Sequence, residues 1–340
     1  MQARDSDQVM GRFGTYAKEY AQSIENPQAF WRKAADMLEW HKKPSTILEY
    51  NEKEPWFSKW FPDGVINMSY NCLDVHVRDG RGDQDAIIYD SPVTGVKERI
   101  SYRELLDRVS TFAGGLRDMG VEAGDRVVIY MPMIPEAVVA MLACGRIGAV
   151  HSVVFGGFAS KELANRITDC EPKVIISASA GVEPTRVVPY KPLLDEALAL
   201  SEHKVSNTVI VQRKNVDKCS MGSIDVDYDE LMRQSSPIEA LPVISTHYHN
   251  ILYTSGTTGL PKGVVRETGG YAVALKYAMG AFYDIKPGEC FWTASDIGWI
   301  VGHLGVYAPL LQGATTIMYE GKPVGTPDAG AFWRVISECK

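Results

Sequence analysis

Between two short apolar runs lies the stretch Tyr253-Thr254-Ser255-Gly256-Thr257-Thr258-Gly259-Leu260-Pro261-Lys262-Gly263. Its hydroxyl side chains supply hydrogen-bond donors, and its glycines let successive backbone N–H groups turn toward one concave surface. Lys262 adds a positive charge at the exit of the stretch. The combination predicts a loop that binds a polyphosphate.

The loop has two competing interpretations. A Walker A loop, as in a P-loop kinase, is disfavoured because Lys262 is followed by Gly263 rather than by Ser or Thr, and because Gly256 and Gly259 are too close together. A flexible linker is disfavoured because linkers seldom carry a Pro-Lys-Gly exit between two apolar strands.

Composition narrows the class of protein. The chain has 340 residues, 45% hydrophobic and 23% charged, which is typical of a globular protein with one large domain and an accessory segment. The net charge is −7 and no Lys/Arg block stands out, so nucleic acid and anionic membranes are disfavoured as partners. Six scattered cysteines without a CxxC pair favour a reducing compartment and disfavour a zinc site.

The sequence shows no apolar run of about 20 residues, the length that spans a bilayer. Its first ten residues lack the apolar core of a signal peptide and the basic character of a transit peptide. We therefore expect no signal peptide, transit peptide or transmembrane segment, and a protein of the mitochondrial matrix or the cytoplasm.

Residues 1–75 differ in pattern from the rest. Apolar residues recur at helical spacing from Phe13 to Ile24, and a second helix is expected with Asn26 as N-cap and Pro27 at its first position, ending near Lys43. An aromatic stretch follows at 56–62. We expect an N-terminal helical layer that packs on a main domain at 76–340.

From about residue 85, short apolar strands alternate with helices. A capping box at Ser101 and Glu104 predicts a helix that continues to Gly120. Further strands are expected at 126–131, 149–154, 173–178, 208–212, 290–293 and 314–319, and helices at 135–147, 160–169, 193–200 and 270–282. This alternation predicts an α/β fold with a doubly wound sheet, in which ligands bind beyond the carboxyl ends of the strands.

Several segments together resemble the adenylate-forming, or AMP-binding, superfamily. The stretch 254–263 is similar to its phosphate loop. Residues 67–74 (Asn-Met-Ser-Tyr-Asn-Cys-Leu-Asp), 151–158 (His-Ser-Val-Val-Phe-Gly-Gly-Phe) and 296–303 (Asp-Ile-Gly-Trp-Ile-Val-Gly-His) resemble acetyl- and propionyl-CoA synthetases. Residues 1–75 then resemble the N-terminal segment of acetyl-CoA synthetases, and 76–340 the AMP-binding domain.

Details of the resemblance favour the propionate branch. Acetate enzymes typically have Thr where this chain has Val301, and the tract from Gly321 to Gly330 is similar to propionate enzymes. One methylene in an apolar pocket changes binding by only about 1–3 kcal/mol, so acetate is expected to remain a poorer substrate. An acetate–CoA ligase is the alternative.

The resemblance implies a ligase that uses ATP, Mg2+ and coenzyme A. A carboxylate attacks ATP to give acyl-adenylate and pyrophosphate, and the coenzyme A thiol then displaces AMP. Catalysis of the first step rests on positioning and charge neutralisation. The implied phosphate-binding residues are Thr254, Ser255, Gly256, Thr257, Thr258, Gly259 and Lys262.

Two further residue sets follow from the resemblance. An acyl pocket is implied at Trp299, Ile300 and Val301, although ordinary core packing explains three apolar residues nearly as well. His303 is the candidate catalytic residue that orients the carboxylate, and a structural histidine is an equal alternative.

The implied coenzyme A site comprises Gly156, Gly157, Glu183, Pro184, Thr185 and Arg186. Arg186 is expected to pair with the 3′-phosphate, since a guanidinium suits phosphate geometry. Glu183 stands where acetate enzymes usually have a second basic residue, which weakens part of that expected contact. The alternatives are a structural turn at the glycines and a surface arginine without a ligand.

Members of the resembled family continue for roughly as long again beyond the position of Lys340. The expected C-terminal lid with its lysine, the adenine contacts and the Mg2+ ligand would lie there, so no metal-binding residue is assigned in this sequence. The second hypothesis is therefore a non-catalytic fragment that binds nucleotide or coenzyme A. We also expect an exposed apolar sheet edge, and we assign no oligomeric state.

Overall fold

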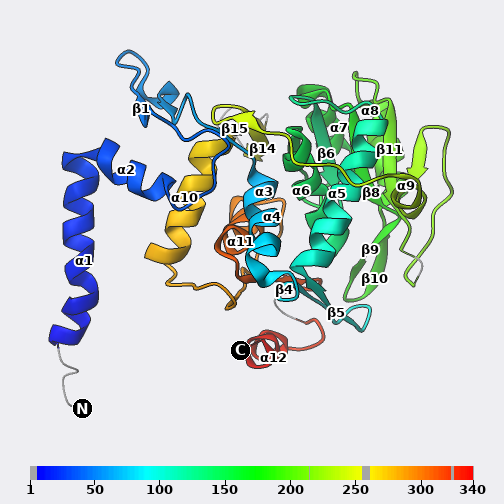
Figure 1. Cartoon of the computed structure of the whole chain (residues 1–340). Helices are drawn as coiled ribbons and strands as arrows, with labels where there is room; N and C mark the ends of the chain where they lie inside the picture. Colours follow the sequence, from blue (N-terminus) through cyan, green and yellow to red (C-terminus); the bar gives the residue numbers. More distant parts are fainter. Residues whose placement is uncertain (1–5, 214, 255–260, 323–324, 340) are drawn as a thin grey trace.

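The computed structural model describes residues 6–213, 215–254, 261–322 and 325–339, with side-chain surroundings from residue 16 onward. Two β-sheets, each packed against helices, form the body of the molecule (Figure 1). The larger sheet has the strand order β12-β11-β8-β6-β7-β14-β15, and all its pairs are parallel except β14 with β15. Its strands are β6 (Arg126–Tyr130), β7 (Val150–Val153), β8 (Val174–Ala178), β11 (Asn207–Val211), β12 (Asp225–Asp227), β14 (Tyr248–Thr254) and β15 (Lys262–Glu267).

Both faces of the larger sheet are covered, because its central strands are apolar on both sides. In β6, Val127 and Ile129 join the core under α5 and α6, whereas Val128 and Tyr130 join the core under α7 and α8. The doubly wound α/β prediction is therefore confirmed. The helices are α5 (Tyr102–Asp118), α6 (Pro135–Ile147), α7 (Ser160–Cys170), α8 (Tyr190–Leu200) and α9 (Tyr228–Gln234).

The smaller sheet has the order β16-β17-β4-β5. One of its faces is covered by α12, where Ile88 and Ile317 pack with Ala331 and Val335. This sheet lies at the opposite end of the body from β15 in Figure 1. Its elements are β4 (Asp85–Ser91), β5 (Val96–Ser101), β16 (Cys290–Phe291) and β17 (Thr315–Tyr319), with α10 (Thr268–Ala281), α11 (Ile300–Gln312) and α12 (Ala331–Glu338) beside them.

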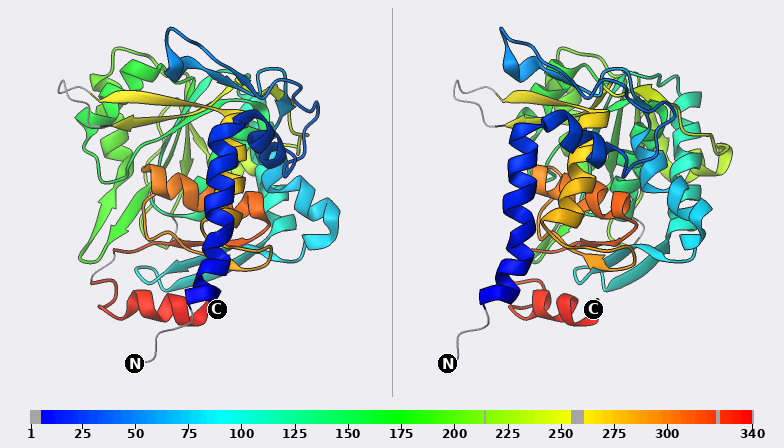
Figure 2. Two further views of the ribbon diagram at one scale, coloured as in Figure 1. Left: turned by 90° about the vertical axis from the view of Figure 1, so that its left-hand side faces the viewer. Right: turned by 60° about the vertical axis from the view of Figure 1, so that its left-hand side comes forward.

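The N-terminal layer packs on the body through its buried α3 and through α2, where the rings of Phe30 and Trp31 lie 5.3 and 5.7 Å from that of Tyr277 in α10. Helix α1 is a rod along the outside of the body (Figure 2). The aromatic stretch packs less than expected, since Trp56 is 74% exposed. The elements are α1 (Ser6–Glu25), α2 (Pro27–Ala35), β1 (Leu48–Glu49), η1 (Pro55–Phe57), β2 (Lys59–Trp60), β3 (Val65–Ile66) and α3 (Met68–Cys72), followed by α4 (Asp74–His76) and η2 (Val77–Arg81). From later in the chain, β13 (Val243–Ile244) pairs with β3.

The capping residues in the sequence predicted the starts of two helices correctly, but the predicted end of one helix is wrong. The capping box of α5 is present, and the Asn26 side chain caps α2 by accepting a hydrogen bond from the N–H of Ala29. The expected continuation of the second helix to Lys43 is wrong, because α2 ends at Ala35 and the chain turns so that the Trp40 indole can donate to the Ala35 carbonyl.

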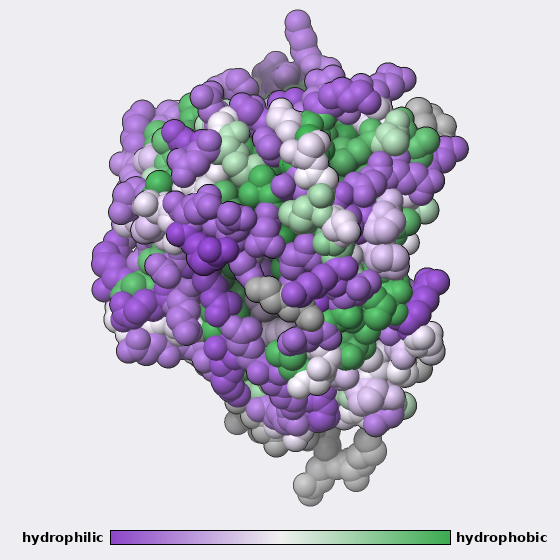
Figure 3. All heavy atoms as spheres, turned by 90° about the vertical axis from the view of Figure 1, so that its right-hand side faces the viewer, coloured by the Kyte–Doolittle hydropathy of each residue, from purple (hydrophilic) through white to green (hydrophobic). Residues whose placement is uncertain are grey.

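β15 forms an edge with exposed apolar side chains, as expected for the sheet. β15 has the larger sheet's β14 on one side, and its Val264 and Val265 are 42% and 44% exposed. The face drawn in Figure 3 is mostly hydrophilic, and small apolar patches interrupt it. Among the described residues, no helix is long and apolar enough to cross a bilayer.

Candidate functional site

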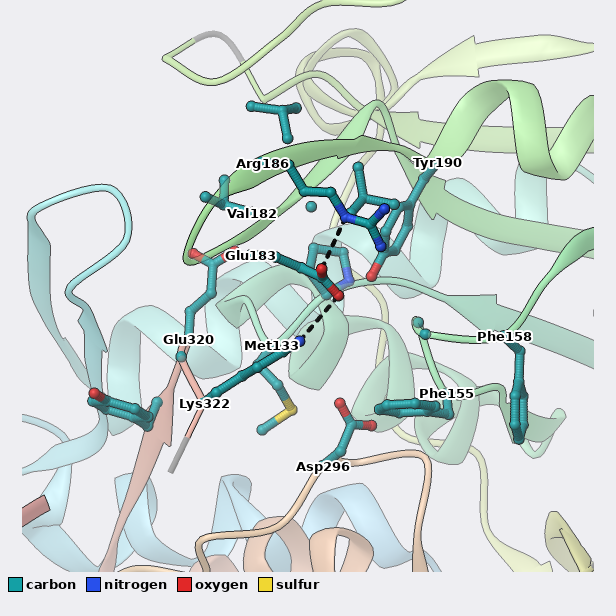
Figure 4. Close-up of a pocket in the computed structure, with 18 of the residues that line it drawn as sticks. Met133, Phe155, Phe158, Val182, Glu183, Arg186, Tyr190, Asp296, Glu320 and Lys322 are labelled. Carbon is teal, nitrogen blue, oxygen red and sulfur yellow. Dashed lines mark hydrogen bonds and ion pairs between the residues drawn. The ribbon is translucent and has the colours of Figure 1, made fainter. Parts of the chain in front are cut away.

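A cavity of about 620 Å³ opens beyond the carboxyl edge of the larger sheet (Figure 4). Its walls come from the segments that follow three neighbouring parallel strands, namely residues 132–133 after β6, 155–159 after β7 and 181–183 after β8. Residues 292–296 and 319–322 close it from the smaller sheet. This is the position at which doubly wound sheets bind ligands.

Gly156 lets the loop after β7 approach the floor of the cavity. A Cβ at this position would lie 2.1 Å from the Tyr190 hydroxyl oxygen, so no larger residue fits without a shift. Tyr190 is itself held by a stacked contact with Tyr130, at 4.9 Å between ring centroids. Gly156 and the adjacent Gly157 both line the cavity, and their contact with coenzyme A stays a prediction.

The tetrad that begins at Glu183 forms the hairpin of β9 (Ala180–Glu183) and β10 (Arg186–Pro189). Glu183 and Arg186 line the cavity, whereas Pro184 and Thr185 form the exposed turn. The Glu183 carboxylate accepts a hydrogen bond from Arg186 Nε at 3.0 Å and another from Lys322 Nζ at 3.2 Å. Arg186, and after it Lys322, holds the pKa of Glu183 below its usual value.

Two more acidic groups line the same cavity. Glu320 is paired with Arg213, through N–O distances of 2.8 and 3.0 Å, so its charge is compensated. Asp296 accepts a hydrogen bond from the Gly298 N–H at 2.7 Å, and burial raises the pKa of its carboxyl to about 6. Asp296 points into the cavity in Figure 4 and is the one of these groups without a basic partner in the described part of the chain.

The expected acyl-pocket residues lie at the start of α11, beside the cavity rather than in its wall. Trp299 packs on the loop after β7, with ring centroids 5.8 Å from Phe155 and 6.2 Å from Phe158. Trp299, Ile300 and Val301 are 44%, 43% and 50% exposed. The described residues do not enclose them, and their role in acyl binding stays a prediction.

His303 lies one turn into α11 and is fully buried. Its ring stacks on that of His151 at 5.6 Å, and burial lowers the pKa of His303 to about 4. The side chain does not line the cavity, so its contact with a carboxylate substrate also stays a prediction.

The stretch expected to bind phosphate lies between the ends of an antiparallel pair of strands. Thr254 ends β14, Lys262 begins β15, and the two face each other in register with exposed side chains. Because β14 is parallel to its neighbour β7, the loop and Gly156 leave the sheet at the same edge. Five of the expected phosphate ligands lie outside the described residues, namely Ser255, Gly256, Thr257, Thr258 and Gly259.

Within the described ranges, no three His, Cys, Asp or Glu residues are grouped to hold a metal ion, so no residue is assigned to Mg2+. Sequence reasoning missed Tyr190, Asp296 and Lys322 as individual site residues. Asp296 and Lys322 lie in segments that the resemblance had already singled out, but only the folded structure brings them to Glu183 and Gly156.

Comparison with known proteins gives a consistent set of similarities. The family model described as "AMP-binding enzyme" matches residues 75–340, and the one described as "Acetyl-coenzyme A synthetase N-terminus" matches residues 16–72. The chain is 54% identical to the mitochondrial acyl-CoA synthetase short-chain family member 3 of Rattus norvegicus, over 96% of this chain and 48% of that protein. It is 42% identical to the propionate–CoA ligase of Salmonella typhimurium, over 95% of this chain and 51% of that protein.

A solved structure is also similar. The acetoacetyl-CoA synthetase of Streptomyces lividans matches with a TM-score of 0.84 and 25% identity, over 92% of this chain and 47% of that one. The chain therefore spans about half the length of the relatives it matches.

Proposed function

Because the chain belongs to the AMP-binding enzyme family and is similar to short-chain acyl-CoA synthetases, we propose that it acts as a propionate–CoA ligase. In the proposed reaction, propionate attacks the α-phosphorus of ATP and pyrophosphate leaves. The thiol of coenzyme A then attacks the acyl carbon of the adenylate, and AMP leaves. The products are propionyl-CoA, AMP and pyrophosphate.

One observation carries the proposal. The segments expected to contact coenzyme A, Gly156–Gly157 and Glu183 with Arg186, come together in one cavity, although they lie on different strand ends. The cavity volume of about 620 Å³ is within the range of small-molecule and cofactor sites. Trp299 packs against its wall at Phe155, so a ligand in the cavity could reach the segment expected to hold the acyl group.

The residues present fit coenzyme A, whose phosphates would meet the Arg186 side of the cavity. Coenzyme A supplies the nucleophilic thiol of the second step. This chain's part is to bind the nucleotide, to exclude water with the aromatic wall of Phe155 and Phe158, and to guide the thiol toward Trp299. We assign binding of the ATP phosphates to Thr254, Lys262 and the residues between them, as the sequence pattern predicts.

The choice of propionate rests on Val301 and on the relative named propionate–CoA ligase. Val301 is at the first turn of α11 with a half-exposed side chain, available to contact a short acyl chain. Acetate would then bind less well but would not be excluded. An acetate–CoA ligase remains the alternative, as does a non-catalytic polypeptide that binds nucleotide or coenzyme A. The mitochondrial matrix, suggested by the names of several relatives, and the cytoplasm are both proposed compartments.

Exchange of labelled pyrophosphate into ATP tests the adenylation step. The purified chain is incubated with ATP, magnesium and either propionate or acetate, and label in ATP is counted. Exchange that requires a carboxylate and is faster with propionate supports the proposal. No exchange, with coenzyme A still bound, would assign the chain to the non-catalytic alternative, and phosphorylated acid with ADP would indicate a kinase.

A further inference from the structure

The rim of the cavity carries two cations from distant parts of the sequence. Arg186 comes from the β9–β10 hairpin, and Lys322 comes from the segment after β17. Each contacts a different oxygen of the same carboxylate, since Arg186 Nε bonds to Glu183 Oε2 and Lys322 Nζ bonds to Oε1. Figure 4 shows Glu183 between the two, with both contacts dashed.

The arrangement leaves positive charge available to a ligand. Glu183 is the most covered of the three, with a side chain 30% exposed against 69% for Arg186 and 55% for Lys322. Within the described part of the chain, Arg186 forms a hydrogen bond only through its Nε, so the two terminal nitrogens of the guanidinium remain available to a ligand. One carboxylate and two cations leave a net positive charge at the rim.

An ion pair at the surface contributes little to stability, typically less than about 1 kcal/mol. The contacts of Glu183 with Arg186 and Lys322 are therefore expected to add little to the stability of the fold. Holding two cations on one carboxylate instead restricts their side-chain freedom before a ligand arrives, which reduces the entropic cost of binding. The nearby Glu320 does not oppose an anion, because Arg213 compensates its charge.

We propose that Lys322, held with Arg186 by Glu183, is a second ligand of the 3′-phosphate of coenzyme A. The inference rests on the proposed function, since it takes the cavity as the coenzyme A site. Lys322 would supply the positive charge that the tetrad lacks at Glu183, and Glu183 is a positioning residue for both cations. The ligand class is a nucleotide with a phosphate on its 3′-hydroxyl.

Binding of coenzyme A and of 3′-dephospho-coenzyme A to the same protein isolates this contact, because the two ligands differ only in the 3′-phosphate. Dissociation constants are measured by calorimetry for the unmodified chain, Lys322→Ala, Lys322→Arg and the control Lys286→Ala. Lys286 is exposed and does not line the cavity. Thermal melting of each variant checks that it is folded.

We expect Lys322→Ala to weaken coenzyme A about tenfold and to change dephospho-coenzyme A less than twofold, with Lys322→Arg near the unmodified value and Lys286→Ala without effect. Equal weakening of both ligands would overturn the inference, and so would an unchanged affinity for coenzyme A. In both of those cases coenzyme A still binds and the proposed function stands. If the unmodified chain does not bind coenzyme A at all, the inference and its premise both fail.

Discussion

Arg213 and Glu320 form a bidentate ion pair that joins the two sheets of the molecule. Arg213 follows β11 of the larger sheet, Glu320 follows β17 of the smaller one, and their N–O distances are 2.8 and 3.0 Å. Both side chains are nearly buried, at 10% and 4% exposed. Tyr89 and Ser91 also donate hydrogen bonds to Glu320, at 2.5 and 2.8 Å, so both oxygens of its carboxylate accept hydrogen bonds within the protein.

Glu320→Gln should therefore destabilise the protein strongly. The substitution leaves the Arg213 charge buried without a carboxylate, which typically costs about 3–5 kcal/mol. The control is Asp36→Asn in the exposed pair of Asp36 with Lys43, for which a loss below about 1 kcal/mol is expected. Free energies of unfolding come from urea titrations, and equal effects of the two variants would contradict the structural role of the Arg213 pair.

A cluster of three buried histidines leads us to predict that the stability of the protein depends on pH. The ring centroid of His151 lies 5.0 Å from that of His249 and 5.6 Å from that of His303. All three side chains are fully buried or nearly so. Burial lowers the pKa of His249 to about 3 and that of His303 to about 4, and it also lowers that of His151. All three are therefore neutral in the folded protein at pH 7.

The sign of the pH dependence follows from these shifts. In the unfolded chain each histidine binds a proton below about pH 6.5, whereas the folded protein excludes it until the pH nears the lowered pKa. Stability should thus fall on acidification from pH 6.5 toward pH 4, by about 1.4 kcal/mol per pH unit for each histidine. His249→Phe should reduce this slope by one proton relative to the unmodified protein. Urea titrations between pH 4.5 and 7 measure both proteins, and equal slopes for the two would refute the prediction.

Local sequence signals predicted single elements of the fold, whereas contacts between distant segments were not predictable. Periodicity and caps were sufficient for α6, whose bounds of 135–147 are as expected, because a Pro at the first position and Gly148 after the last are local signals. The predicted end of β7 also placed Gly156 at the carboxyl edge of the sheet, where the structure has it lining the cavity. The contact of Lys322 with Glu183 was not predictable, because it joins residues 139 positions apart and depends on how the two sheets meet. The same holds for Tyr190 under Gly156, since neither residue carries a local signal of the other.

The close approach of Gly156 to Tyr190 yields a third prediction. In Gly156→Ala the added methyl group would meet the Tyr190 hydroxyl, so the loop or the tyrosine must shift, the cavity wall changes shape, and coenzyme A should bind at least tenfold more weakly. Tyr190→Phe in the same protein removes the nearest atom and should restore part of the affinity. Calorimetry with coenzyme A on the two single variants and the double variant makes the comparison. A double variant no better than Gly156→Ala would contradict the assigned clash.

Val301 provides the most direct test of substrate choice. The residue lies half-exposed at the first turn of α11, next to Trp299, where the resemblance implies contact with the acyl chain. Val301→Thr replaces a methyl group by a hydroxyl of nearly the same volume, so it should penalise the terminal methyl of propionate more than acetate. A loss of about 1 kcal/mol corresponds to a several-fold change in the ratio of kcat/KM for propionate to that for acetate. Pyrophosphate exchange with each acid measures the ratio, and Val265→Thr on the exposed edge of β15 serves as the matched control. If the ratio is unchanged in both variants, Val301 does not contact the acyl group, and the choice of propionate must rest on another residue.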